Sequence, residues 1–205
     1  MASSRRCISC GNPETAPNET EVNILMVGLE CCGKDNLINS FISNAEQYTC
    51  ETRTFTNVYR CRFLFQGKYF RISIQNPSHI NIMKPICHKG LQNCYISADV
   101  VIYCYGIDTP ESLTILQKLL IPKVWKFTKN MPSVLVGNRV DLRNDPATIR
   151  RLAQRQMKPL TIDDGRQTRE SFNINGFIEC MDVNPSSVFN VFRMALTCFL
   201  RYFYT

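Results

Sequence analysis

The stretch VNILMVGLECCGKD, residues 22–35, joins an apolar run to a glycine-containing turn. A continuous apolar run is typical of a strand that is covered on both faces of a sheet. The turn matches the pattern G-x-x-x-x-G-K-[ST] at Gly28, Gly33 and Lys34. In that pattern, backbone N–H groups and the lysine ammonium surround phosphate groups at the start of a helix. The last position carries Asp35 in place of a hydroxyl residue, so the turn predicts phosphate binding and leaves its metal chemistry open.

The composition indicates a single globular domain. The chain has 205 residues, of which 44% are hydrophobic and 20% charged, and this balance is ordinary for a domain with a sizeable core. No run approaches the roughly 20 apolar residues of a membrane span, and the N-terminus lacks the apolar core of a signal peptide. We expect a cytoplasmic protein with a flexible, polar N-terminal arm over residues 1–20 and one domain over residues 21–205.

The net charge and the cysteine content say less about function than the motifs do. The eleven cysteines are expected to be free thiols, because the cytosol keeps thiols reduced. Cys7 and Cys10 form one C-x-x-C without the second pair that a structural zinc site needs. The net charge of +7 favours acidic partners or anionic lipid, but the scattered basic residues do not indicate nucleic-acid binding. One acyl chain on either cysteine would give only marginal anchoring, so we expect at most weak peripheral contact with a membrane.

Apolar patterning predicts an α/β fold with a largely parallel sheet. Two alternating runs, 58–65 and 68–74, flank Gln66-Gly67 and predict an antiparallel hairpin. Further strands and helices alternate along the chain, as in parallel sheets. The carboxyl ends of such strands bind ligands. The other expected strands are 98–107, 132–137 and 177–180, and the expected helices are 34–41, one that begins after the N-cap Thr109, and 188–200, with Phe189, Phe192, Leu196, Phe199 and Phe203 facing the core.

A second motif follows the expected strand 132–137. It is Asn138-Arg139-Val140-Asp141, which resembles the guanine-reading N-K-x-D loop of small GTPases. In that family the aspartate accepts hydrogen bonds from guanine, the asparagine contacts the base edge, and the lysine stem packs on the base. Arg139 keeps a cation that can stack on a ring, although arginine and lysine are not equivalent.

Three long stretches make the chain similar to a Rho-family small GTPase of the Ras superfamily, over about residues 21–202. They are SADVVIYCYGIDTPESL, PKVWKFTKNMPSVLVGNRVDLRND and FIECMDVNPSSVFNVFRMAL. The resemblance implies a Ras-like P-loop fold: a mostly parallel six-stranded sheet with one antiparallel hairpin, flanked by helices. It also implies an extra helix at about residues 145–156. The nucleotide-binding positions that it implies are Gly28, Cys32, Gly33, Lys34, Asp35, Asn138, Arg139 and Asp141.

The resemblance implies magnesium ligands at Asp35 and at Thr54, with Thr52 and Thr56 as rivals of Thr54. The chain departs from the Rho pattern at Asp35, where the family has Ser or Thr. A carboxylate can bind a hard cation, yet Asp35 also lies near phosphate. At about 4 Å and an effective dielectric constant of about 20, one such repulsion costs on the order of 4 kcal/mol. Glu30 adds a second negative charge unless it turns outward into water. The sequence therefore predicts poor magnesium binding.

Counted from Gly67 and Lys68, the hydrolytic segment of the family, D-x-x-G-Q, falls on residues 76–80. Counting from the other end needs a few inserted residues near HKGLQN, so the register is open, but no D-x-x-G occurs in this region. Asn76 replaces the aspartate that holds magnesium through water, and His79 replaces the glycine that senses the terminal phosphate. Ile80 replaces the glutamine that orients the attacking water. The aromatic residue that packs on guanine is missing or displaced to Tyr48, and Met181-Asp182 replace a loop that touches the guanine carbonyl. We expect no catalytic residue and little or no GTP hydrolysis.

Two functions remain open on the sequence. The first is an atypical Rho-like protein that binds GTP or GDP and acts in signal transduction through effector and regulatory proteins. The second is a pseudo-GTPase that binds no nucleotide and serves as an interaction or scaffold module. The chain as given ends CFLRYFYT, which lacks a C-a-a-X site, so no prenyl anchor is expected.

Overall fold

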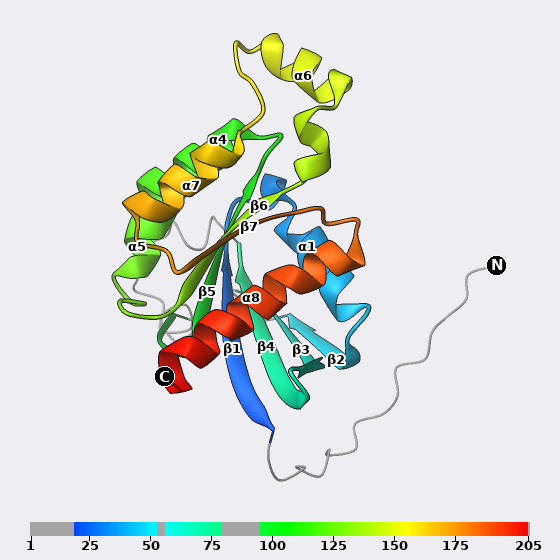
Figure 1. The fold of residues 1–205 in the computed structure, drawn as a ribbon, viewed down its shortest axis with the longest axis vertical. Helices are drawn as coiled ribbons and strands as arrows, with labels where there is room; N and C mark the ends of the chain where they lie inside the picture. The colour runs from blue at the N-terminus through cyan, green and yellow to red at the C-terminus, as the bar shows by residue number, and fades with distance from the viewer. Residues whose placement is uncertain (1–18, 53–55, 79–94, 205) are drawn as a thin grey trace, which may run out of the picture.

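The computed structural model describes residues 19–52, 56–78 and 95–204. Its centre is one seven-stranded sheet in the order β2-β3-β4-β1-β5-β6-β7, with helices on both faces (Figure 1). The strands are β1 (Thr20–Val27), β2 (Glu46–Thr52), β3 (Thr56–Phe65), β4 (Lys68–Pro77), β5 (Val100–Gly106), β6 (Ser133–Asn138) and β7 (Gly176–Cys180).

The parallel part of the sheet confirms the α/β prediction. β1 pairs in parallel with β4 and β5, and β6 pairs in parallel with β5 and β7. All seven residues of β5 are buried, as a strand covered on both faces requires. β3 and β4 form the predicted antiparallel hairpin. Gln66 and Gly67 have φ values of 50° and 74°, and positive φ at both central residues suits the twist of a two-residue hairpin turn.

The prediction of six strands was wrong by one edge strand. β2 pairs antiparallel with the outer edge of β3, with an irregular register between Glu46 and Thr49. Its sequence, EQYTCET, is mostly polar and shows no alternation of the kind that predicts a half-buried strand. Main-chain pairing and surface contacts such as the 2.9 Å ion pair of Arg60 with Glu51 hold this edge, so its side chains carry little apolar signal.

The helices cover two separate apolar cores, one on each face of the sheet. α1 and α8 cover one face, while α4, α5 and α7 cover the other (Figure 1). A π-helical turn, η2 (Leu116–Leu120), connects α4 to α5. The helices are α1 (Lys34–Ile42), α4 (Pro110–Ile115), α5 (Ile121–Trp125), α6 (Pro146–Ala153), α7 (Ile162–Ser171) and α8 (Pro185–Tyr204).

α6 lies within the range 145–156, where the Rho resemblance implies an extra helix, and it projects beyond the sheet (Figure 1). The Asp145 side chain caps it by accepting a 2.7 Å hydrogen bond from the Thr148 N–H. That bond lowers the pKa of Asp145. Thr109 is the N-cap of α4 as predicted, but its side chain makes no capping hydrogen bond.

The C-terminal helix largely follows its predicted pattern. Phe192, Leu196 and Phe199 are buried, and Phe189 packs partly buried against the same core. Phe203 was predicted to face the core but is 45% exposed. It lies in the last turn of the helix, where its ring packs on Phe199 at a centroid distance of 4.9 Å.

The stacked rings of Phe41 and Phe192, 3.7 Å apart, join α1 to α8 and therefore set the position of the turn before α1. We predict that Phe192→Ala lowers the free energy of unfolding by about 3–5 kcal/mol, through lost burial and a cavity. Phe203→Ala is the matched control at an exposed site, where a smaller loss, under about 1 kcal/mol, is expected. Urea unfolding of both variants measures the difference, and equal losses would contradict this account of the core.

Candidate nucleotide site

The turn after β1 has the glycine geometry that its sequence pattern predicts. Residues Glu30–Cys32 form a short 3-10 turn, η1, and Gly33 then adopts φ 78° and ψ 16° before α1 begins. A Cβ atom on Gly33 would lie 2.6 Å from Asn138 Nδ2 and 2.8 Å from Asp182 Oδ2. A Cβ atom on Gly28 would lie 2.5 Å from the Cys104 carbonyl oxygen. Both glycines are therefore required sterically, and Gly33 is also required by its backbone conformation.

Lys34, Asp35 and Asn76 converge at the start of α1. Lys34 is 1% exposed, and its Nζ lies 3.9 Å from Asp35 Oδ1. Asp35 Oδ1 also accepts a 2.6 Å hydrogen bond from Asn76 Nδ2. The two positions at which the sequence departs from the family's magnesium pattern therefore lie side by side, although they are far apart in the chain.

Asn76 carries an unsatisfied acceptor at this point. The residue is 5% exposed, and its Oδ1 atom has no hydrogen-bond partner among the described residues. A buried acceptor without a donor is unfavourable by about 1–3 kcal/mol. A proton donor, such as a water molecule bound to a cation, fits this atom. Within the described ranges, no three His, Cys, Asp or Glu side chains form a cluster that could hold a metal by themselves.

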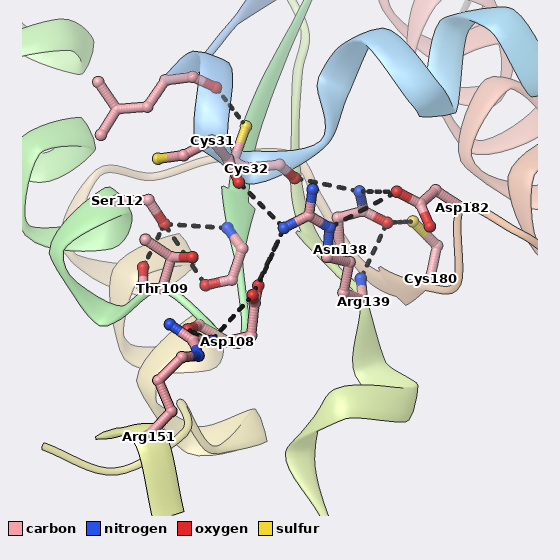
Figure 2. A network of polar contacts seen from close by, with 12 residues as sticks. Cys31, Cys32, Asp108, Thr109, Ser112, Asn138, Arg139, Arg151, Cys180 and Asp182 are labelled. Carbon is pink, nitrogen blue, oxygen red and sulfur yellow. Dashed lines mark hydrogen bonds and ion pairs between the residues drawn. The ribbon is translucent and has the colours of Figure 1, made fainter. Parts of the chain in front are cut away.

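Asn138 joins the turn after β1 to the turn after β6 (Figure 2). It is fully buried, and its Nδ2 donates 3.1 Å hydrogen bonds to the Cys32 carbonyl and to Asp182 Oδ2. Its Oδ1 accepts from the Arg139 N–H at 2.9 Å and from Cys180 Sγ at 3.3 Å. Asn138 therefore links the two sequence motifs by a direct hydrogen bond.

The Cys180 contact depends on a protonated thiol. Burial raises the pKa of Cys180 to about 12, and the charges of Asp182 and Asp141 contribute to the rise. The thiol therefore remains a donor to Asn138 at neutral pH. Asp141 itself is exposed in the short helix η3 (Val140–Arg143). Arg143, at the end of η3, pairs with Glu179 of β7 at 2.9 Å and fixes this loop to the sheet.

Arg139 has a left-handed backbone, with φ 63° and ψ 47°, and its guanidinium lies between two carboxylates (Figure 2). Its Nη1 donates to the Cys31 carbonyl at 3.1 Å and lies 3.4 Å from both oxygens of Asp108. Its Nε lies 3.7 Å from Asp182 Oδ2. The side chain that the sequence assigns to ring stacking is therefore held by polar contacts in this structure.

Sequence reasoning missed two members of this network. Asp108 follows the carboxyl end of β5, a position typical of ligand sites in such sheets, but it was assigned no role. It accepts from Arg139 and also from Arg151 of α6, whose Nη2 lies 3.3 Å from Asp108 Oδ2. Asp182 was identified only as a lost guanine contact, and its pairing with Asn138 and Arg139 has no local sequence signal.

Several predicted positions lie outside the described residues: Cys7, Cys10, Thr54, His79 and Ile80. Thr56, one of the rivals of Thr54, begins β3 opposite Pro77. Its hydroxyl donates to the Asn57 carbonyl at 3.1 Å. The next residue, Asn57, is paired with Asn76, so this end of β3 is adjacent to the Asp35–Asn76 pair.

Comparison with known proteins agrees with this geometry. The sequence model of the Ras family matches residues 23–200. This range contains both turns and all of the sheet except residues 20–22 at the start of β1. The chain belongs to the Ras family. Among Ras-family proteins it is similar to the GTP-binding protein rho5 of Schizosaccharomyces pombe, with 28% identity over 180 residues, 86% of this chain and 86% of that protein. This similarity confirms the Rho-type resemblance found in the sequence.

On membrane association, the structure addresses only whether a helix could span the bilayer. Across the described ranges, none of the helices combines the length and the apolar character needed to cross a bilayer.

The contacts of Gly33 generate a matched pair of predictions. Gly33 and Gly67 have nearly the same φ, 78° and 74°, but a Cβ on Gly67 would meet no described atom within 4 Å. We predict that Gly67→Ala costs about 1 kcal/mol of backbone strain, whereas Gly33→Ala costs roughly 1–3 kcal/mol more because Asn138 and Asp182 must move. Urea unfolding measures both. Similar losses in the two variants would show that the turn tolerates the extra atom.

Proposed function

We propose that the chain is a Rho-type protein that binds GTP or GDP, hydrolyses GTP little or not at all, and acts through effector and regulatory proteins. The hydrogen bond from Asn138 Nδ2 to the Cys32 carbonyl is the observation that supports this best. It joins the phosphate-type turn directly to the base-reading turn. The relative rho5 is named a GTP-binding protein, which supports the same activity here.

The phosphate end retains the features that bind an anion. Gly33 lets the backbone turn directly into the N-terminus of α1, where N–H groups and the helix dipole favour negative charge. Lys34 is buried beside this turn. Glu30 is exposed, so solvent and salt can screen its charge from a bound phosphate.

The residues around Asp35 fit a magnesium ion in an altered arrangement. Asp35 would hold the cation through its carboxylate, and the free acceptor of Asn76 would hold a coordinated water. Thr54 is the further ligand that the sequence proposes. Relative to the family pattern, the carboxylate and the neutral ligand have exchanged positions, so the pair still carries one negative charge. When bound, the cation would neutralise phosphate charge.

Slow hydrolysis follows from the residue types at the expected catalytic positions. Ile80 stands where the family has a glutamine that orients water. An aliphatic side chain neither donates nor accepts a hydrogen bond, so it cannot position a nucleophile. A bound GTP would therefore persist, and signalling would depend on partner binding and nucleotide exchange.

A nucleotide-free pseudo-GTPase is the second candidate. One observation favours it: the donors of Asn138 and Arg139 are already engaged by carboxylates of the chain itself. In that case the same contacts would stabilise an empty pocket, and the domain would serve as an interaction module.

Nucleotide content separates the two candidates. We predict that the purified full chain releases GTP or GDP on acid denaturation, detected by ion-pair chromatography. Added GDP with magnesium should raise the stability by about 2.7 kcal/mol at a ligand concentration of 100 Kd, measured as a shift in Tm. ATP serves as the control ligand. Absence of bound nucleotide, together with no GDP-dependent shift at millimolar concentration, would select the pseudo-GTPase.

A double-mutant cycle tests the exchanged carboxylate. Asn76→Asp alone places two carboxylates at a 2.6 Å contact, and we predict a loss of about 1–3 kcal/mol in stability from repulsion and the lost hydrogen bond. Asp35→Ser with Asn76→Asp restores the family's residue types and should recover most of that loss. The double variant should also bind GDP with a larger magnesium dependence than the parent chain. Additive effects of the two changes would argue that the residues do not act as a pair.

A further inference from the structure

We infer that Asp182 is a built-in competitor of the nucleotide base: its carboxylate engages the donors that the base-reading loop would offer to a purine. The inference rests on the proposed nucleotide binding and specifies how the same pocket limits its own affinity. Nothing in the Rho pattern supplies this group, because the chain places Met181-Asp182 where the family has a small, neutral loop.

The hydrogen-bonding capacity of Asn138 is fully used. An amide nitrogen has two hydrogens and an amide oxygen has two lone pairs. The two hydrogens are directed to the Cys32 carbonyl and Asp182 Oδ2, and the oxygen accepts from Arg139 and Cys180. A base edge can bind Asn138 only if one contact opens. The Cys32 contact joins the two turns, and the Arg139 N–H and Cys180 contacts hold the Asn138 oxygen within its own turn and against β7. The Asp182 contact is therefore the one that can open without dismantling the site.

Asp182 is also placed to control Arg139. Its Oδ2 lies 3.7 Å from Arg139 Nε and would lie 2.8 Å from a Cβ on Gly33. The carboxylate therefore lies against the phosphate-type turn and beside the guanidinium (Figure 2). Its side chain is 6% exposed. A charged contact this well buried is stronger than one in water, so it opposes the reorientation of Arg139 onto a ring.

The surrounding loop permits the carboxylate to leave. Asp182 lies between the end of β7 and the start of α8, and its neighbour Val183 is 75% exposed. Asn184 anchors the following turn, where its Oδ1 accepts from the N–H groups of Ser186 and Ser187. Rotation of the Asp182 side chain toward solvent would free one Asn138 hydrogen and would remove one of the two carboxylates beside Arg139, leaving Asp108 and the Cys31 carbonyl as its partners. The apparent affinity for nucleotide is then reduced by the fraction of molecules in which the carboxylate remains inside.

The sign of the effect distinguishes a competitor from a structural buttress. Titration of the full chain with a fluorescent GDP analogue in magnesium should show about tenfold tighter binding for Asp182→Ala, within the usual range of coupling between competing contacts. Asp182→Asn, which keeps the shape but not the charge, should show a smaller gain. Asp163→Ala is the matched control, since it removes an acid whose side chain is 82% exposed on α7, and its affinity should stay within about twofold of the parent.

Stability provides a second readout. Without nucleotide, Asp182→Ala should have a lower Tm than the parent chain, because it loses the contacts to Asn138 and Arg139. With saturating GDP the shift in Tm should be larger for the variant than for the parent. The inference is overturned if the parent chain binds GDP and the folded Asp182→Ala and Asp182→Asn variants bind it equally or more weakly. That result would leave the proposed function intact. Failure of the parent and both variants to bind GDP overturns both.

Discussion

The hydrogen bond between the buried Asn138 amide and the Cys32 carbonyl is the constraint on which the arrangement of the two turns depends. Each turn lies at the carboxyl end of a parallel strand, and β5 separates the two strands. The sheet brings the turns to one edge, and this buried side chain, together with the Arg139 contact to the Cys31 carbonyl, holds them at bonding distance. Its burial excludes water as a competing partner, which increases the strength of the bond. The left-handed Gly33 and the contacts of Arg139 are arranged around it.

Much of the fold could be predicted because its central strands are covered on both faces. β1, β5 and β6 are continuous apolar runs, and the glycine pattern, Lys34 and Asn138 follow them at fixed places. β2 could not be predicted, since an edge strand paired through its backbone has no apolar period. In the site, the partners of Arg139 were missed for a similar reason: Asp108 and Asp182 are brought to it by the tertiary fold, from segments that give no local indication of the pairing.

Three acidic residues of this site share one feature: each has a hydrogen-bond donor or a cation of the chain beside it. Asp35 is matched by the neutral Asn76, and Asp108 and Asp182 by Arg139. Each carboxylate that would oppose a phosphate or a base in isolation therefore has a donor within the protein. These pairings explain how a Ras-family sequence accommodates several unusual acids without unfolding. They also mean that ligand binding at this site exchanges internal ion pairs for external ones, so the net gain in free energy is smaller than the number of contacts suggests.

Asp108 serves two arginines at once, Arg139 from the base-reading loop and Arg151 from the projecting helix α6. A single carboxylate has limited capacity, so a change in the pairing of one arginine alters the electrostatic surroundings of the other. The projecting helix α6 is thus linked to the base-reading loop through the two ion pairs of Asp108. Heat or salt that breaks the Arg151–Asp108 ion pair would therefore change the pairing of Asp108 with Arg139 before it disturbs the sheet.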